Sequence, residues 1–122
     1  MAEHNDVGKW GEQLARQYLE AQGYAILQCN YRCGKHEVDI IAYLEGVVVF
    51  VEVKTRKNNE YGEPEDFVLS AKQRAYIRMA NDYVVKNNRD DEVRFDIIAI
   101  TFSSSDYSLN HIPNAFSACD LN

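Results

Sequence analysis

Four charged side chains interrupt a stretch that otherwise has the composition of two buried β-strands. The stretch is HEVDIIAYLEGVVVFVEVKTR, residues 36–56, and its content of Val, Ile, Phe and Tyr is typical of strands. The dipeptide Glu45-Gly46 predicts a tight turn, so the two halves are expected to form a hairpin. Charges are costly inside buried strands unless something compensates them, and this singles out Glu37, Asp39, Glu52 and Lys54.

The register of the hairpin predicts that these charges meet. A two-residue turn pairs the residues that flank it, and successive outward steps place Asp39 opposite Glu52. Two steps further out, Glu37 lies opposite Lys54. Because side chains alternate between the faces of a strand, all four then share one face, although a one-residue bulge would offset the pairing.

Two facing carboxylates repel one another, and a divalent cation between them reverses the sign of the interaction. Mg²⁺ suits such a site because it takes few carboxylates and keeps several waters, and Mn²⁺ is the alternative ion. A metal held by Asp39 and Glu52 would bind a phosphate oxygen and lower the pKa of an attacking water. Lys54 would neutralise the charge that develops on the phosphate or orient the water.

An ordinary structural explanation also exists. Glu37 and Lys54 would form a cross-strand ion pair, while Asp39 and Glu52 would each find a separate arginine. The combination of an acid pair and a lysine on one face of buried-type strands favours the site. Asp96 presents the same problem in a later strand, but Arg94 two residues earlier predicts a structural ion pair there.

The rest of the chain predicts two helices and further strands. Apolar residues recur at three- and four-residue steps over residues 6–22, and this periodicity places Trp10 and Tyr18 in a stripe that faces the core. Residues 57–66 are polar and include Gly62 and Pro64, so they predict a loop that is a candidate mobile flap. The other expected elements are a strand over 24–31, a helix over 71–86, a strand over 93–101 and a short strand over 108–112 that Pro113 ends.

Length and composition favour one α/β domain over residues 1–122, with a mixed sheet flanked by helices. The longest unbroken apolar run, residues 47–51, is too short to span a bilayer, and the polar N-terminus has no apolar signal region. A cytoplasmic protein without membrane contact is therefore expected. The odd number of cysteines, three, argues against a disulfide framework.

Cys29, Cys33 and His36 have a spacing that suggests a metal site, but His111 and Cys119 lie far along the chain. Structural zinc usually has four ligands at recognisable spacing, so free cysteines packed near a strand are favoured.

The charge balance argues against a simple nucleic-acid-binding domain. The chain has 13 basic and 19 acidic residues and a net charge of −6. Basic residues are nevertheless concentrated between residues 32 and 78, interrupted by acidic residues at 60–66. The candidate nucleic-acid contacts in this segment are Arg56, Lys57, Lys72 and Arg74.

Asp39, twelve further residues and then Glu52-Val53-Lys54 resemble the D…ExK core of the PD-(D/E)XK nuclease superfamily. The blocks GKWGEQLARQYLEAQGYAILQCNYR, HEVDIIA, VFVEVKTR and VRFDIIAI also resemble the small bacterial YraN-like family, which is largely uncharacterised and described as endonuclease-like. The resemblance covers residues 8–116. The triplet alone is weakly specific, whereas four blocks in the same order are much more so.

This resemblance implies a restriction-endonuclease-like α-β-β-β-α-β core and a metal-dependent endonuclease that acts on branched or junction DNA. Glu12 matches a first-helix glutamate that helps to bind metal in Holliday-junction-resolvase-like members, although its spacing alone indicates a solvated helix charge. Gln73 resembles a second-helix glutamine of the superfamily, but Ser70 and Gln73 also have the spacing of a capping box. Val38 departs from the superfamily's proline, and His36 replaces a frequent glycine.

The leading hypothesis is therefore a Mg²⁺- or Mn²⁺-dependent DNA endonuclease, and symmetric cutting of two strands would favour a homodimer. A binding module that keeps the nuclease fold without turnover is the rival, and the net charge favours it. The intact set of Asp39, Glu52 and Lys54 favours the enzyme. A protein-binding scaffold would leave the acid pair unexplained, and a partner protein that supplies basic surface stays open.

Overall fold

The computed structural model describes residues 2–57 and 70–117, and it has the α/β architecture that the sequence predicts. Most of the predicted flap, residues 57–66, lies outside these residues. The order of helix, three strands, helix and strand is confirmed, with a further strand at the end. The elements are α1 (Ala2–Ala21), β1 (Ala25–Cys33), β2 (His36–Leu44), β3 (Val47–Lys57), α2 (Ser70–Lys86), β4 (Glu92–Phe102) and β5 (Tyr107–Phe116).

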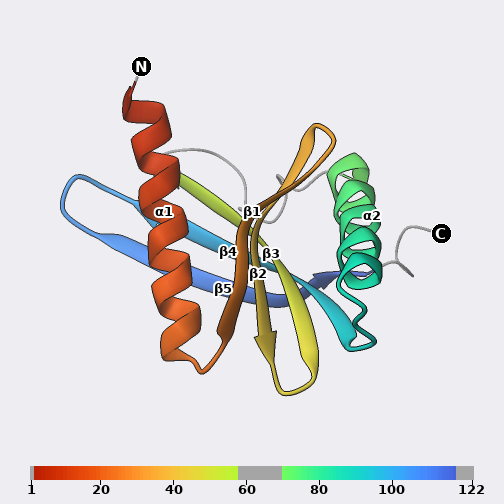
Figure 1. Cartoon of the computed structure of the whole chain (residues 1–122). Helices are drawn as coiled ribbons and strands as arrows, with labels where there is room; N and C mark the ends of the chain where they lie inside the picture. The colour runs from red at the N-terminus through yellow and green to blue at the C-terminus, as the bar shows by residue number, and fades with distance from the viewer. Residues whose placement is uncertain (1, 58–69, 118–122) are drawn as a thin grey trace.

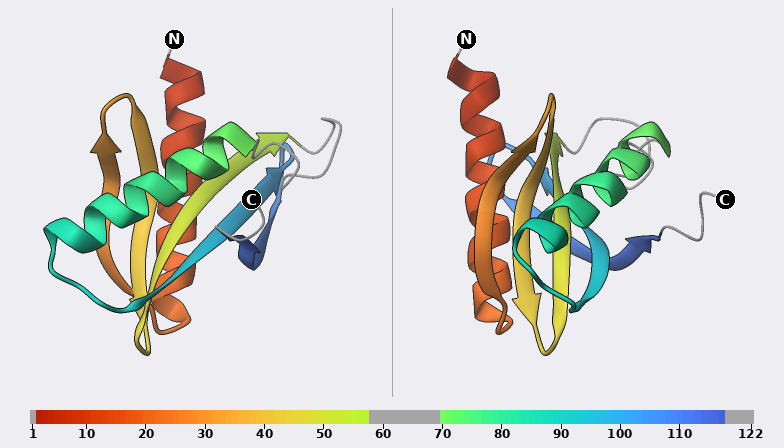
Figure 2. Two further views of the ribbon diagram at one scale, coloured as in Figure 1. Left: turned by 90° about the vertical axis from the view of Figure 1, so that its right-hand side faces the viewer. Right: turned by 45° about the vertical axis from the view of Figure 1, so that its right-hand side comes forward.

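The strands form one mixed sheet in the order β1-β2-β3-β4-β5. Neighbouring strands are antiparallel except for β3 and β4, which are parallel and have α2 between them in the chain. The two helices cover opposite faces of the sheet, α1 on one side and α2 on the other (Figures 1 and 2). This arrangement is consistent with a restriction-endonuclease-like core.

The predicted turn is present between β2 and β3. Glu45 and Gly46 both have positive φ, 48° and 85°, as a two-residue hairpin turn requires. Leu44 pairs with Val47, and the predicted register continues to Ile40 and Val51. The ladder ends there, so the predicted backbone pairs of Asp39 with Glu52 and of Glu37 with Lys54 are not formed. The strands diverge at the charged residues.

Each face of the sheet has its own apolar cluster. On one face, Ala15 and Leu19 of α1 are buried against strand residues that include Val49, Val51 and Ile98. On the other face, α2 packs over Phe50, Phe95 and Phe116, using the buried residues Ala75, Tyr76, Met79, Ala80 and Tyr83. The sheet is therefore buried on both sides, and Asp39 and Glu52 lie on its inner strands β2 and β3.

Trp10 is not the core residue that the helical stripe predicts, because its side chain is 38% exposed. It contacts the rings of Phe102 and Tyr107 edge-on, beside a cavity of about 550 Å³ at the start of β5. Tyr18, by contrast, is half-buried and its hydroxyl is hydrogen-bonded to Nδ1 of His111. The apolar stripe therefore covers the sheet along the central and C-terminal turns of α1, whereas Trp10 lies at the margin of the sheet.

The boundaries of two elements differ from prediction. The first helix begins at Ala2, four residues earlier than expected. The last strand continues through Pro113 to Phe116. Proline is tolerated there because β5 is an edge strand, whose outer side makes no hydrogen bonds to another strand of the sheet. Neither described helix is long and apolar enough to cross a bilayer.

Candidate active site

Asp39 lies at the point where β2 and β3 separate. Its Oδ2 atom accepts a hydrogen bond of 2.8 Å from the backbone N–H of Val53, and its own N–H points at the hydroxyl of Tyr76 at 3.5 Å. Two cavities meet at this residue, one of about 430 Å³ on the α1 side and one of about 260 Å³ on the α2 side. Asp39 therefore borders a cavity on each face of the sheet.

Burial raises the pKa of Asp39 to about 8, and the nearby negative charge of Glu52 acts in the same direction. Glu12 adds a smaller effect of the same sign, while the hydrogen bond from Val53 and the charge of Lys72 oppose it. Negative charge at this site is thus only partly compensated by the protein's own groups. A bound cation would relieve it.

Glu52 is the most enclosed member of the site, since it is only 2% exposed. Its Oε1 atom accepts a hydrogen bond of 2.5 Å from the hydroxyl of Tyr76. Its Oε2 atom is 2.6 Å from Nζ of Lys72 and 3.8 Å from Nζ of Lys54. The predicted lysine is therefore beside the predicted glutamate, but a second lysine from α2 lies closer.

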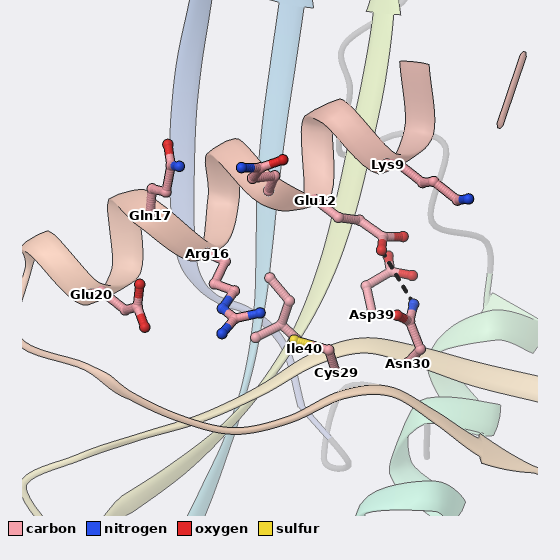
Figure 3. A pocket seen from close by; sticks show the side chains of 10 residues that line it. Lys9, Glu12, Arg16, Gln17, Glu20, Cys29, Asn30, Asp39 and Ile40 are labelled. Carbon is pink, nitrogen blue, oxygen red and sulfur yellow. Dashed lines mark hydrogen bonds between the residues drawn. The ribbon is translucent and has the colours of Figure 1, made fainter. Parts of the chain in front are cut away.

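Glu12 reaches the site from α1. Its Oε1 atom accepts a hydrogen bond of 3.2 Å from Nδ2 of Asn30 in β1, and its side chain lines the larger cavity together with Asp39. Figure 3 shows these three side chains pointing toward one another. Close contact between helix and sheet allows this reach, because a Cβ added to the preceding residue, Gly11, would lie 2.0 Å from Oγ1 of Thr55 in β3.

The remaining predicted residues lie around this centre. Glu37 lines the smaller cavity but is 3.4 Å from Arg32 of β1, so the ion pair proposed with Lys54 is replaced by one across the β1–β2 pair. Gln73 is half-buried on α2, and the side chain of its capping partner Ser70 lies outside the described part of the chain. Among the candidate nucleic-acid contacts, Lys57 and Arg74 are exposed and Arg56 is half-buried.

The carboxylate oxygens of the site are ligands that Mg²⁺ or Mn²⁺ accepts, although they are not already arranged as a complete coordination shell. Within residues 2–57 and 70–117, no three His, Cys, Asp or Glu side chains form a preassembled ligand group. Mg²⁺ needs only one or two protein carboxylates, because waters and substrate phosphate complete its shell. Asp39 and Glu52 supply two, and Glu12 approaches from the opposite side. In this structure the positive charge closest to Glu52 in the site is the ammonium of Lys72, 2.6 Å from Oε2.

Cys29 and Cys33, the cysteines in the described part of the chain, lie on opposite faces of the sheet. Cys29 packs against the cluster under α1, whereas Cys33 packs against the cluster under α2. Both are free thiols within the described chain, as the sequence favoured. Cys119 lies outside the described residues.

Two features of the site were missed by sequence reasoning. Tyr76 was not singled out within the helix expected over 71–86, although it is 1% exposed and bridges Asp39 and Glu52. Lys72 is predicted from the sequence as a nucleic-acid contact, and its pairing with Glu52 was not anticipated. Their four-residue separation, which places both on one face of a helix, was the available signal.

The predicted pair of Asp96 and Arg94 is confirmed and belongs to a separate network. Arg94 donates two hydrogen bonds to Asp96, 2.9 Å from Nε and 2.8 Å from Nη2. Nε2 of His111 lies 2.7 Å from Oδ2 of Asp96, and its Nδ1 is hydrogen-bonded to the hydroxyl of Tyr18 at 3.0 Å. Burial alone would raise the pKa of Asp96, but these donors hold it below its ordinary value. The network ties α1 to β4 and β5.

Sequence comparisons place the chain among proteins of the same size. Residues 11–100 match the sequence model of Uncharacterised protein family UPF0102. UPF0102 proteins of Flavobacterium psychrophilum and Christiangramia forsetii are 46% and 47% identical over 116 residues, covering 95% of this chain and 98% of each relative. A UPF0102 protein of Geobacter metallireducens is 46% identical over 118 residues, covering 95% of this chain and 97% of the relative. The chain belongs to the uncharacterised protein family UPF0102.

Proposed function

We propose that this protein is a Mg²⁺- or Mn²⁺-dependent endonuclease that hydrolyses DNA phosphodiester bonds. The observation that carries the proposal is the convergence of Asp39 and Glu52, two enclosed carboxylates on neighbouring strands, with lysine ammonium groups beside them. Buried acids whose charge is incompletely compensated concentrate at functional sites. The resemblance to the PD-(D/E)XK pattern at these positions suggests branched DNA as the substrate.

The residues divide the chemistry among themselves. A metal bound here would supply Lewis acidity and a water of lowered pKa. Asp39 and Glu52 would hold that ion. Glu12, which lines the same cavity as Asp39, would assist in binding it. Lys54, whose Nζ is 3.8 Å from Glu52, would stabilise negative charge on the phosphate as the bond to the leaving oxygen breaks. Arg56, Lys57, Lys72 and Arg74 would contact the backbone of the nucleic acid.

A binding module without turnover is the second candidate. Both oxygens of Glu52 are occupied by protein groups, Tyr76 and Lys72, and the net charge of −6 disfavours tight nucleic-acid binding. In either function the chain would work in the cytoplasm. A homodimer would serve symmetric cutting of two strands, and a protein partner would supply additional basic surface.

Cleavage of labelled four-way-junction, flap, duplex and single-stranded DNA tests the proposal, with Mg²⁺ or Mn²⁺ added to each. The Asp39→Asn, Glu52→Gln double variant is the inactive control. Glu92→Gln, a substitution of an exposed acid at the start of β4 that lines neither cavity at Asp39, is the matched active control. Metal-dependent cutting by the wild type and by Glu92→Gln, lost in the double variant, is the expected result. Absence of cutting by a folded wild type on every substrate would favour the binding module.

A further inference from the structure

The two oxygens of Glu52 are held by different kinds of partner from the same helix. Tyr76 donates to Oε1 and is 1% exposed, with its ring packed edge-on against Phe116. Lys72 holds Oε2, and its side chain is 42% exposed. The two residues lie one helical turn apart on α2. One partner is therefore fixed in the core, while the other can leave for solvent.

We infer that Lys72 is an internal cation that occupies the place of the metal on Oε2 of Glu52, and that metal binding displaces it while Tyr76 keeps Oε1. The inference rests on the proposed metal site and adds to it a residue that sets the affinity for metal. It also specifies that Glu52 offers the metal a single oxygen.

Geometry and charge both favour the exchange. The ammonium of Lys72 lies 2.6 Å from Oε2, and Mg²⁺ binds carboxylate oxygens at about 2.1 Å, so both cations would compete for one oxygen. Their like charges would repel across a few ångströms in a poorly solvated site. Lys72 also lines the same cavity as Asp39 and Glu52, so it stands where an ion shared by these carboxylates would enter.

Tyr76 cannot make the same exchange. Its hydroxyl donates to Glu52 and faces the backbone N–H of Asp39, which links the two strands that carry the carboxylates. Removing it from Oε1 would require moving a buried aromatic ring. Tyr76 is accordingly a positioning residue, which holds the Glu52 carboxylate so that Oε2 faces the cavity.

Displacement gives Lys72 a second use. Released from Glu52, its ammonium lies at the mouth of a cavity of about 260 Å³ in which a phosphate would meet the metal. The lysine would neutralise a carboxylate when metal is absent and contact phosphate when metal is present. The charge of Lys72 would then become available to the nucleic acid only in the loaded protein.

Direct measurement of Mn²⁺ binding tests the inference without relying on cleavage. Free Mn²⁺ is titrated by electron paramagnetic resonance against wild type, Lys72→Met, Tyr76→Phe and Lys86→Met. Lys86→Met is the matched control, because Lys86 also pairs with an acid on α2, Asp82, at 3.3 Å. Removing one competing charge should tighten Mn²⁺ binding by Lys72→Met about tenfold, while Tyr76→Phe should weaken it. Lys86→Met should leave it unchanged.

Equal or weaker Mn²⁺ binding by Lys72→Met would overturn the inference even if the wild type cuts DNA. Tighter binding by Lys72→Met in a protein that cuts nothing would support the inference about Lys72 and contradict the proposed nuclease activity. Absence of Mn²⁺ binding by all four proteins would overturn the inference as well as the metal site.

A second measurement uses the unmodified protein. Amine acetylation followed by mass spectrometry reports the reactivity of each lysine with and without saturating Mn²⁺. The reactivity of Lys72 should rise several-fold on metal addition as its ion pair with Glu52 breaks, whereas that of Lys86 should stay constant. An unchanged reactivity of Lys72 at saturating metal would show that it stays on Glu52 and would overturn the inference.

Discussion

The carboxylate of Asp39 accepts the backbone N–H of Val53 at 2.8 Å, just beyond the last ladder pair between β2 and β3. A side chain thus satisfies a backbone donor where the two strands have separated. The same residue is one of the two central carboxylates of the candidate site. Its ionisation is therefore coupled to the stability of the hairpin as well as to the binding of metal.

Asp39 should make the metal-free protein less stable as pH rises. Its folded-state pKa of about 8 lies above its ordinary value of 3.8, so the native state binds more protons between these values. The associated stability is complete below about pH 4 and is lost as pH rises through about 8. Urea unfolding at about pH 5 and about pH 8.5 should show a larger loss for wild type than for Asp39→Asn. Parallel losses in both proteins would contradict the assignment.

Gly11 and Gly8 of α1 should respond oppositely to alanine. A Cβ at Gly11 would lie 2.0 Å from Oγ1 of Thr55, whereas one at Gly8 would have no atom within 4 Å. Gly11→Ala should destabilise by about 2 kcal/mol through overpacking, and Gly8→Ala should stabilise by about 0.5–1 kcal/mol through helix propensity. Denaturant midpoints measure both changes, and Thr55→Ala should partly rescue Gly11→Ala. A Gly11→Ala protein as stable as wild type would show that α1 is not seated on β3 at this point.

Arg94 should matter far more than a comparable surface arginine. Arg94→Met leaves the fully buried Asp96 without its bidentate partner and should cost about 3 kcal/mol of unfolding free energy. Arg32→Met removes a surface pair with Glu37 in which the arginine side chain is 71% exposed, and it should cost less than about 1 kcal/mol. Thermal and urea unfolding of the two variants gives the comparison. Equal losses would mean that the network around Asp96 contributes nothing beyond a surface pair.

The acids around the site should rank by their distance from its centre in a metal-dependent thermal shift. Metal at about 100 times its Kd stabilises a folded protein by about 2.7 kcal/mol, so millimolar Mn²⁺ should raise the Tm of wild type. Glu52→Gln should abolish this rise and Glu12→Gln should reduce it. Glu37→Gln should keep most of it, because Glu37 is paired with Arg32. Loss of the shift in Glu37→Gln would place that residue among the ligands instead.

Periodic features of this fold could be predicted from the sequence, and contacts between distant elements could not. The turn at Glu45-Gly46 set a register that is correct to Ile40 and Val51, because each pair follows from the one before it. Beyond that point β2 and β3 diverge, and the Asp39 carboxylate accepts the N–H of Val53 in place of a backbone carbonyl. The alternation of apolar and polar residues carries no signal for this replacement. The site residues still come together because the Asp39 carboxylate reaches Val53 across the gap and Tyr76 of α2 contacts both strands.

The helices illustrate the same limit. Helical periodicity located α1 and α2 and their buried faces, but it could not distinguish the sheet centre from its margin. Trp10 therefore looked like a core residue although it lies at the margin with Phe102 and Tyr107. Tyr76 escaped notice for the complementary reason, since its role depends on where α2 crosses β2 and β3.

The irregularities of β1 and β5 have a consequence for how copies of this protein can associate. An extra residue at Leu27 interrupts the β1 ladder, and Asn30 has positive φ. On the opposite margin, β5 contains Pro113, a shifted register between Ile112 and Phe116, and Asn114 at positive φ. Both outer strands thus present a broken row of donors and acceptors, which resists the docking of a foreign strand. Self-association, and aggregation of the folded chain, would have to proceed through side-chain surfaces instead of a continuous intermolecular sheet.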